Sequence, residues 1–197
     1  MLTPDFSSCP VIPVVVIRSP EETLPTLSAL REGGIPVAEI TFRTSCAAEA
    51  IRVGRKAFPE MNIGAGTVIN AEQAKAAIGA DARFIVSPGL SEEVADVCEQ
   101  ARIPYLPGCV TPTEIMRALA LGITTVKFFP ANVYGGLSAL RALAGPFPQV
   151  KFIPTGGADL SNLRQWLDQP MIAAVGGSFM MKGDVRANCR KIAEVLK

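Results

Sequence analysis

A single lysine interrupts an apolar stretch, Thr124–Pro130, that otherwise has the composition of a buried strand. β-branched and aromatic residues fit a pleated, half-buried surface, and Pro130 cannot continue a strand ladder. If this strand lies in a parallel sheet, both of its faces are buried, and removing the Lys127 ammonium from water costs free energy. A lysine at a sheet edge would stay solvated, but a closed barrel has no edge. Lys127 is therefore the first candidate for a catalytic residue.

Two more charged residues fall on one face of a second predicted strand. Side chains alternate along a strand, so Lys127 shares its face with Thr125 and Phe129. By the same rule, Glu39 shares its face with Arg43 on the second strand. If both faces point inward, a lysine, a glutamate and an arginine meet in an otherwise apolar interior. The alternative is that Glu39 and Arg43 form a structural ion pair with each other.

These three residue types suit chemistry on a ketone. A neutral lysine amine attacks a ketone to form a Schiff base, and the protonated imine then withdraws electrons from neighbouring bonds. Arg43, a second cation, is expected to favour the neutral amine of Lys127. Glu39 can move the protons that carbinolamine formation and C–C cleavage need. Since neither step requires a metal, we expect catalysis without a metal or other cofactor.

The chain contains no histidine, which removes the commonest general base and metal ligand. Catalysis must then use carboxylates, lysine, cysteine or hydroxyl groups. The five cysteines are odd in number and scattered, without the C-x-x-C spacing typical of zinc or redox sites. We expect them to be reduced and mostly buried. They are Cys9, Cys46, Cys98, Cys109 and Cys189.

The overall charge balance argues against polyanionic partners. The 19 basic and 18 acidic residues nearly cancel, so neither nucleic acid nor an anionic membrane surface is indicated. A small molecule is the expected partner. The first residues lack the pattern of a secretory signal, and no apolar run is long enough to span a membrane, so we expect a cytoplasmic protein. The length of 197 residues is compatible with one domain covering residues 1–197.

Strand-like and helix-like stretches alternate along the whole chain, which gives eight strand–helix units. Strict alternation indicates parallel strands joined by right-handed crossovers. Eight repeats with short loops favour a closed (β/α)8 barrel over an open sheet of the flavodoxin or Rossmann type. The predicted strands are residues 11–17, 37–42, 62–66, 83–86, 103–106, 124–130, 150–153 and 171–175.

Helix starts carry recognisable caps. Ser19–Glu22 and Thr111–Glu114 both match the capping-box pattern, with proline at the first helical position. Asn70 and Ser91 are predicted to cap the helices that follow them. Pro25 lies early in the first predicted helix, where it weakens the first turn.

Two glycine-rich stretches follow the seventh and eighth predicted strands, Thr155–Gly157 and Gly176–Ser178. Many barrels bind phosphate at these positions through backbone N–H groups and a helix N-terminus. Glycine pairs also form tight turns, which is the alternative interpretation of each stretch taken singly. Thr67, at the end of the third strand, offers a hydroxyl that could reach a carboxylate.

Six short motifs, in order along almost the whole chain, resemble the 2-keto-3-deoxy-6-phosphogluconate (KDPG) aldolases, also called 4-hydroxy-2-oxoglutarate (KHG) aldolases. The resemblance implies a class I aldolase that splits KDPG into pyruvate and glyceraldehyde 3-phosphate. It also implies a homotrimer. The forms of the motifs are more similar to the gluconate enzyme than to its galactonate relative. The motifs are Glu39–Thr44, Gly64–Val68, Ser87–Gly89, Lys127–Pro130, Pro154–Gly157 and Gly176–Ser178.

The resemblance also implies a role for each matching residue. Lys127 would be the Schiff-base lysine and Glu39 the general acid/base. Arg43 and Thr67 would hold the pyruvate carboxylate, and Arg18, at the end of the first strand, would be a further contact. The remaining residues would line the pocket or surround the phosphate. Pro88 and Phe129 belong to the pocket group, and Thr155, Gly156, Gly157, Gly177 and Ser178 to the phosphate group.

Two other functions are compatible with the same barrel. A phosphosugar isomerase or epimerase would use Glu39 as a base without covalent chemistry on Lys127. A non-catalytic phosphometabolite sensor would need neither residue, and it would then carry two buried charges at a cost in stability. The resemblance favours the aldolase over both.

Overall fold

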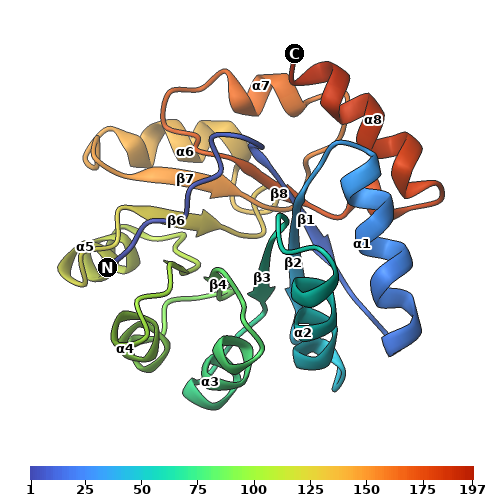
Figure 1. The fold of residues 1–197 in the computed structure, drawn as a ribbon. Coiled ribbons are helices and arrows are strands. Elements are labelled where there is room, and N and C mark those ends of the chain that lie inside the picture. Colours follow the sequence, from blue (N-terminus) through green and yellow to red (C-terminus); the bar gives the residue numbers. More distant parts are fainter.

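The computed structural model describes residues 1–197 and contains eight strands that alternate with helices. In Figure 1 the helices surround the strands, which form the centre of the molecule. The strands are β1 Val11–Val15, β2 Val37–Thr41, β3 Asn62–Gly66, β4 Ile85–Val86, β5 Tyr105–Leu106, β6 Thr125–Phe128, β7 Lys151–Pro154 and β8 Val175–Gly177. The helices are η1 Pro20–Glu22, α1 Thr23–Glu32, α2 Ala47–Ala57, α3 Ala71–Gly79, α4 Glu92–Gln100, α5 Pro112–Ala120, α6 Gly136–Ala144, α7 Leu163–Leu167, η2 Phe179–Met181 and α8 Val185–Val195.

The strands close into a barrel. Six of them form a sheet in the order β5-β4-β3-β2-β1-β8, and β6 pairs with β7. Parallel bridges between Gly108 and Lys127 and between Thr155 and Gly176 join the two sheets at both seams. The predicted (β/α)8 barrel is therefore confirmed, and the open-sheet alternative is wrong. A closed order places β2 and β6 on opposite sides of the interior.

The last strand begins later than predicted. Residues 171–175 were the predicted strand, but β8 covers Val175–Gly177, so the Gly176–Gly177 pair lies in the strand and not in a loop after it. The residues before it pair with β7 only through the bridge between Phe152 and Ile172. The consequence is that Gly177 and Ser178 lie at the mouth of the barrel.

Three predicted helix caps are confirmed. The side chains of Asn70, Ser91 and Thr111 each accept a hydrogen bond from a backbone N–H in the first turn of the following helix. Thr111 also forms the complete capping box with Glu114.

The capping box predicted at Ser19 is wrong. The Ser19 side chain makes no capping hydrogen bond, and residues 20–22 form the 3-10 helix η1. An α-helix starting at Pro20 would need the N–H of residue 25, and Pro25 has none. The α-helix therefore begins at Thr23, which places Pro25 in its first turn, where no donor is required. The Glu22 carboxylate instead accepts a hydrogen bond from the Arg18 backbone N–H at 2.8 Å.

Residues 1–10 cross the end of the barrel where the strands begin. The Phe6 side chain is buried, and its ring meets that of Phe84, just before β4, edge to face with centroids 5.2 Å apart. The terminal amine of Met1 lies 3.7 Å from the Glu99 carboxylate on α4. This end is thus filled by apolar side chains. None of the helices combines the length and the apolar character that crossing a membrane requires.

Candidate active site

Lys127 and Glu39 meet inside the barrel. The Nζ of Lys127 on β6 lies 3.2 Å from Oε1 of Glu39 on β2, and the two side chains are only 7% and 3% exposed. The sequence analysis predicted that these residues would meet if their strand faces pointed inward, and the structure shows that Lys127 and Glu39 do meet in the interior. Because the amine and the carboxylate are within hydrogen-bonding distance, a proton can pass between them directly.

A glycine on the neighbouring strand makes room for this pair. Thr41 of β2 lies in register with Gly66 of β3. A β-carbon on Gly66 would lie 2.1 Å from Oε1 of Glu39, which is less than any non-bonded contact allows. The Glu39 carboxylate therefore occupies space that only glycine leaves free.

Arg43 lies just beyond the end of β2, and its partner is Thr67. Its Nε donates a hydrogen bond to Oγ1 of Thr67 at 3.2 Å. Thr67 has a positive φ of 55°, an unusual backbone conformation for a β-branched residue. Arg43 forms no ion pair with Glu39, so the structural ion pair considered from the sequence is absent. The contact between Arg43 and Thr67 is consistent with the prediction that both residues bind the same carboxylate at the ends of β2 and β3.

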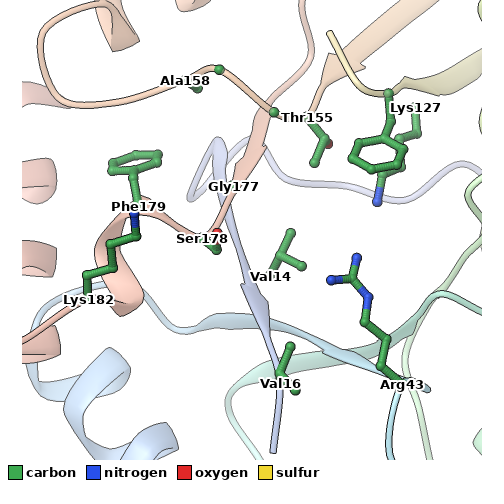
Figure 2. Close-up of a pocket in the computed structure, with 13 residues that line it drawn as sticks. Val14, Val16, Arg43, Lys127, Thr155, Ala158, Gly177, Ser178, Phe179 and Lys182 are labelled. Atoms are coloured by element: carbon green, nitrogen blue, oxygen red, sulfur yellow. The ribbon is translucent and has the colours of Figure 1, made fainter. Parts of the chain in front are cut away.

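A pocket of about 390 Å³ opens at the mouth of the barrel. Figure 2 shows Arg43 and Lys127 on one side of it and Ser178 on the other. The aromatic ring of Phe129 lies with its centroid 5.4 Å from the Lys127 Nζ. The predicted site residues that line this pocket are Arg43, Lys127, Phe129, Thr155, Gly156, Gly157, Gly177 and Ser178.

The other predicted site residues lie outside this pocket. Glu39 is buried behind Lys127. Thr67 does not line the pocket itself, but it is hydrogen-bonded to Arg43, which does. Pro88 lines a separate pocket of about 210 Å³ with Val68 and Ser87. Arg18 is exposed beyond the end of β1. The roles of these residues in binding stay predictions.

The glycines after β7 have conformations that favour glycine. Gly156 and Gly157 have φ values of +93° and +86°, in the left-handed region. A β-carbon on Gly157 would also lie 2.5 Å from Cβ of Asn132. Between β7 and β8, a β-carbon on Gly176 would meet Oγ1 of Thr155 at 2.4 Å. These turns leave backbone N–H groups beside the pocket without side chains in the way.

Comparison with known proteins identifies the family. The family model described as "KDPG and KHG aldolase" matches residues 4–195. The chain belongs to this aldolase family. A curated relative, the KHG/KDPG aldolase of Escherichia coli, is 43% identical over 175 residues, which is 89% of this chain and 82% of the relative.

Solved structures of related aldolases have the same fold. The KDPG aldolase of Legionella pneumophila, with pyruvate captured as a covalent carbinolamine intermediate, superposes with a TM-score of 0.88 at 42% identity, covering 96% of this chain and 93% of that one. The KDPG aldolase of Zymomonas mobilis with 3-phosphoglycerate gives a TM-score of 0.88 at 39% identity, covering 92% and 90%. Members of this family are thus similar to this chain over almost its whole length.

Sequence reasoning missed five residues that line the pocket of this aldolase. Lys182 follows η2 and belongs to none of the six motifs. Its position four residues beyond Ser178, at the mouth end of β8, is the signal that could have drawn attention to it. The others are apolar and complete the walls. They are Val14, Val16, Ala158 and Phe179.

The thiols of this aldolase do not compete with Lys127 as nucleophiles. All five cysteines are free, and four of them are buried, as predicted. Burial raises the pKa of Cys98 and of Cys109 to about 12, and that of Cys189 to about 11. These groups are therefore uncharged thiols at neutral pH, and the thiolate is the reactive form. None of the five lines the pocket.

Proposed function

We propose that the protein is a class I aldolase that cleaves KDPG to pyruvate and glyceraldehyde 3-phosphate through a Schiff base on Lys127. The observation that carries this proposal is the Lys127 amine, which lines the mouth pocket and lies 3.2 Å from the Glu39 carboxylate. The same chemistry would split 4-hydroxy-2-oxoglutarate into pyruvate and glyoxylate. Both substrates are 2-keto acids with a hydroxyl at C4, which is the arrangement that an aldol cleavage requires.

The pair of residues accounts for the first half of the reaction. Glu39 takes a proton from the Lys127 ammonium, and the free amine attacks the C2 ketone to form a carbinolamine. Glu39 returns the proton to the carbinolamine hydroxyl, which leaves as water, and the nitrogen lone pair forms the protonated imine. No metal or other cofactor enters any of these steps.

The second half breaks the carbon–carbon bond. Glu39, which is a carboxylate again after the dehydration step, removes the proton of the C4 hydroxyl. The C3–C4 bond then breaks, its electron pair moves toward the imine nitrogen, and the aldehyde leaves. The remaining enamine takes that proton back from Glu39 at C3, which restores the carboxylate and returns the enamine to a protonated imine. Water hydrolyses this imine, which releases pyruvate and restores the Lys127 amine.

The pocket provides separate positions for the two ends of the substrate. We assign the carboxylate beside the ketone to Arg43 and Thr67, since a guanidinium and a hydroxyl both donate to an anion. The phosphate is assigned to the turns that contain Thr155, Gly156, Gly157, Gly177 and Ser178. Phe129 forms the wall beside Lys127. Pro88 and Arg18 lie outside the pocket, and their contacts with the substrate stay predictions.

Borohydride trapping tests the covalent step. The protein is mixed with pyruvate, reduced with borohydride, digested and mapped by mass spectrometry. We expect one pyruvate-derived adduct, on Lys127, and none on Lys151, which lies at the opposite end of the barrel where β7 begins. Absence of an adduct, or an adduct on another lysine, would contradict the proposal.

Substitution of the same lysine separates covalent from non-covalent mechanisms. Lys127→Arg keeps the cation but removes the nucleophile, and we expect KDPG cleavage to fall by at least about 10⁴-fold. Lys151→Arg is the control and should leave the rate unchanged. Substantial activity in Lys127→Arg would favour the isomerase or epimerase mechanism with Glu39 as base.

The cellular setting and assembly are further parts of the proposal. KDPG cleavage is a step of the Entner–Doudoroff pathway of carbohydrate metabolism. We also propose a homotrimer, and exposed apolar side chains such as Val133 and Tyr134, 71% and 51% exposed, are available for contacts between subunits. Size-exclusion chromatography with light scattering measures the assembly directly, and a monomer would contradict it.

A further inference from the structure

We propose that Lys182 is a specificity-determining residue that favours substrates whose far end carries a phosphate dianion. The inference rests on the proposed aldolase function and adds to it a side chain outside the glycine turns. Lys182 lines the same pocket as Lys127, Ser178 and Gly157. It is a cation in a wall otherwise formed, on that side, by glycines, a hydroxyl and apolar side chains.

The charged side chains that line the pocket are all cations. Arg43, Lys127 and Lys182 line it, and no aspartate or glutamate does. Lys127 is paired with Glu39, and Arg43 donates to Thr67. The Lys182 side chain is exposed, and its ammonium forms no ion pair and no hydrogen bond. Since Arg43 is assigned to the carboxylate of the keto acid, Lys182 is the cation available to an anionic group at the other end of the substrate.

The backbone of this segment is fixed even though the side chain is not. The Asn188 side chain on α8 donates hydrogen bonds to the carbonyl groups of Met180 and Lys182, at 3.2 and 2.7 Å. Met180 is fully buried, and Gly183 turns the chain with a φ of +71°. These contacts hold the Cα of Lys182 at the pocket rim, so that its side chain needs little further ordering to reach an anion.

Lys182 also lies at the correct end of the pocket. Figure 2 shows its side chain beside Phe179 and Ser178, across the pocket from Arg43 and Lys127. A substrate bound to Lys127 through its ketone would extend its far end toward Ser178 and Lys182. The cations at the two ends would then bind different groups of one molecule, the keto-acid carboxylate and the terminal phosphate.

The expected contribution is moderate because the ammonium is exposed. In water, two unit charges 4 Å apart attract each other enough to change a binding constant roughly five- to tenfold, and a phosphate dianion carries nearly twice that charge. Removing the Lys182 charge should therefore raise KM for a phosphorylated substrate about tenfold. A substrate with an uncharged terminal hydroxyl should show no such change.

The experiment compares KDPG with the same keto acid lacking its phosphate. For Lys182→Gln we expect KM for KDPG to rise about tenfold with kcat unchanged, and kcat/KM for the dephosphorylated compound to stay within about twofold. Lys182→Arg should restore the wild-type KM. Lys191→Gln, on the exposed face of α8, makes the same change in net charge away from the pocket and serves as the matched control. Added salt should reduce the difference between wild type and Lys182→Gln.

Several outcomes would overturn the proposal. They are an equal change for both substrates, a change in kcat alone, or a Lys182→Gln variant indistinguishable from Lys191→Gln. Calorimetric titration with inorganic phosphate gives a readout that does not depend on turnover. If the wild type cleaves neither compound, the aldolase function fails, yet weaker phosphate binding by Lys182→Gln than by Lys191→Gln would still support the role of Lys182. Equal phosphate binding by the two variants would contradict it.

Discussion

Two glycines on one strand of the barrel make room for opposite kinds of neighbour. Gly64 and Gly66 lie two residues apart on β3, so a β-carbon added to either one would point to the same face of the strand. A β-carbon on Gly64 would lie 2.4 Å from the Phe84 ring, and one on Gly66 would lie 2.1 Å from the Glu39 carboxylate. Gly64 thus leaves room for an aromatic ring at the apolar end of the barrel, and Gly66 leaves room for a carboxylate nearer the mouth.

The difference between the neighbours decides what each glycine contributes. The Phe84 ring is stiff, fully buried and packed against Phe6, so it has nowhere to move. The Glu39 carboxylate is the end of a side chain with several rotatable bonds, and it lies behind Lys127, which lines the open pocket. The same added methyl group should therefore cost stability at Gly64 and catalysis at Gly66.

Among the changes around the two glycines, removing the charge of the Glu39 carboxylate beside Gly66 should have the largest effect. Glu39→Gln keeps the shape of the side chain and a hydrogen-bond acceptor for Lys127, but it cannot take up a proton. We expect kcat for KDPG cleavage to fall about 10³-fold, within the range typical of general acid–base residues. Steady-state kinetics measure this, with Glu72→Gln on the exposed face of α3 as control. A loss below about tenfold would mean that another group moves the protons.

Gly66→Ala should lower activity more than stability. The added methyl group displaces the Glu39 carboxylate from Lys127, and a misplacement of about 1 Å can reduce a rate by about 10²-fold. Because the displaced side chain is flexible, the melting temperature should fall by only a few degrees. Kinetics and thermal unfolding of the same sample measure both quantities. A variant that is strongly destabilised but fully active when folded would contradict the comparison.

Gly64→Ala should show the reverse pattern. Overpacking against the Phe84 ring is expected to lower the free energy of unfolding by about 1–3 kcal/mol, while kcat of the folded enzyme stays unchanged. Urea denaturation measures the loss. Phe84→Leu in the same chain relieves the clash, so the double variant should be more stable than the sum of the two single changes predicts. Strict additivity would show that Phe84 is not the neighbour that matters.

Most of the architecture could be predicted from local patterns. The eight alternating units follow from apolar periodicity, and the alternation of side chains shows that Lys127 and Glu39 can meet if their strand faces point inward. Thr111 caps its helix as predicted because all parts of that motif lie within four residues. These features depend on short stretches of chain, which a sequence displays directly.

The features that were predicted wrongly or missed depend on residues that lie outside the short motif that each prediction used. The Ser19 box failed because Pro25, beyond the motif, removes a donor that an α-helix there would need. The space that Gly66 leaves for Glu39 exists only once β2 and β3 pair in register. Lys182 reaches the pocket because Asn188 fixes the turn before α8. No periodicity in the sequence marks any of these relationships.

Substitution of Thr111, a helix-capping residue near the mouth, should have the smallest effect. It tests whether a residue affects catalysis simply because it lies close to the mouth. Thr111 lies just after β5, at the same end of the barrel as Gly66 but outside the pocket, and its hydroxyl accepts a hydrogen bond from the Glu114 backbone N–H at 3.3 Å. Thr111→Ala should lower the free energy of unfolding by about 1 kcal/mol, without a change in kcat.

Ser19→Ala is the control, because Ser19 lies in a similar sequence pattern but makes no cap bond. It should change the free energy of unfolding by less than about 0.5 kcal/mol. Urea denaturation and kinetics of both variants give the comparison. If Thr111→Ala lowered kcat at unchanged stability, closeness to the mouth would matter in itself, and the contrast between Gly64 and Gly66 could no longer be explained by their neighbours alone.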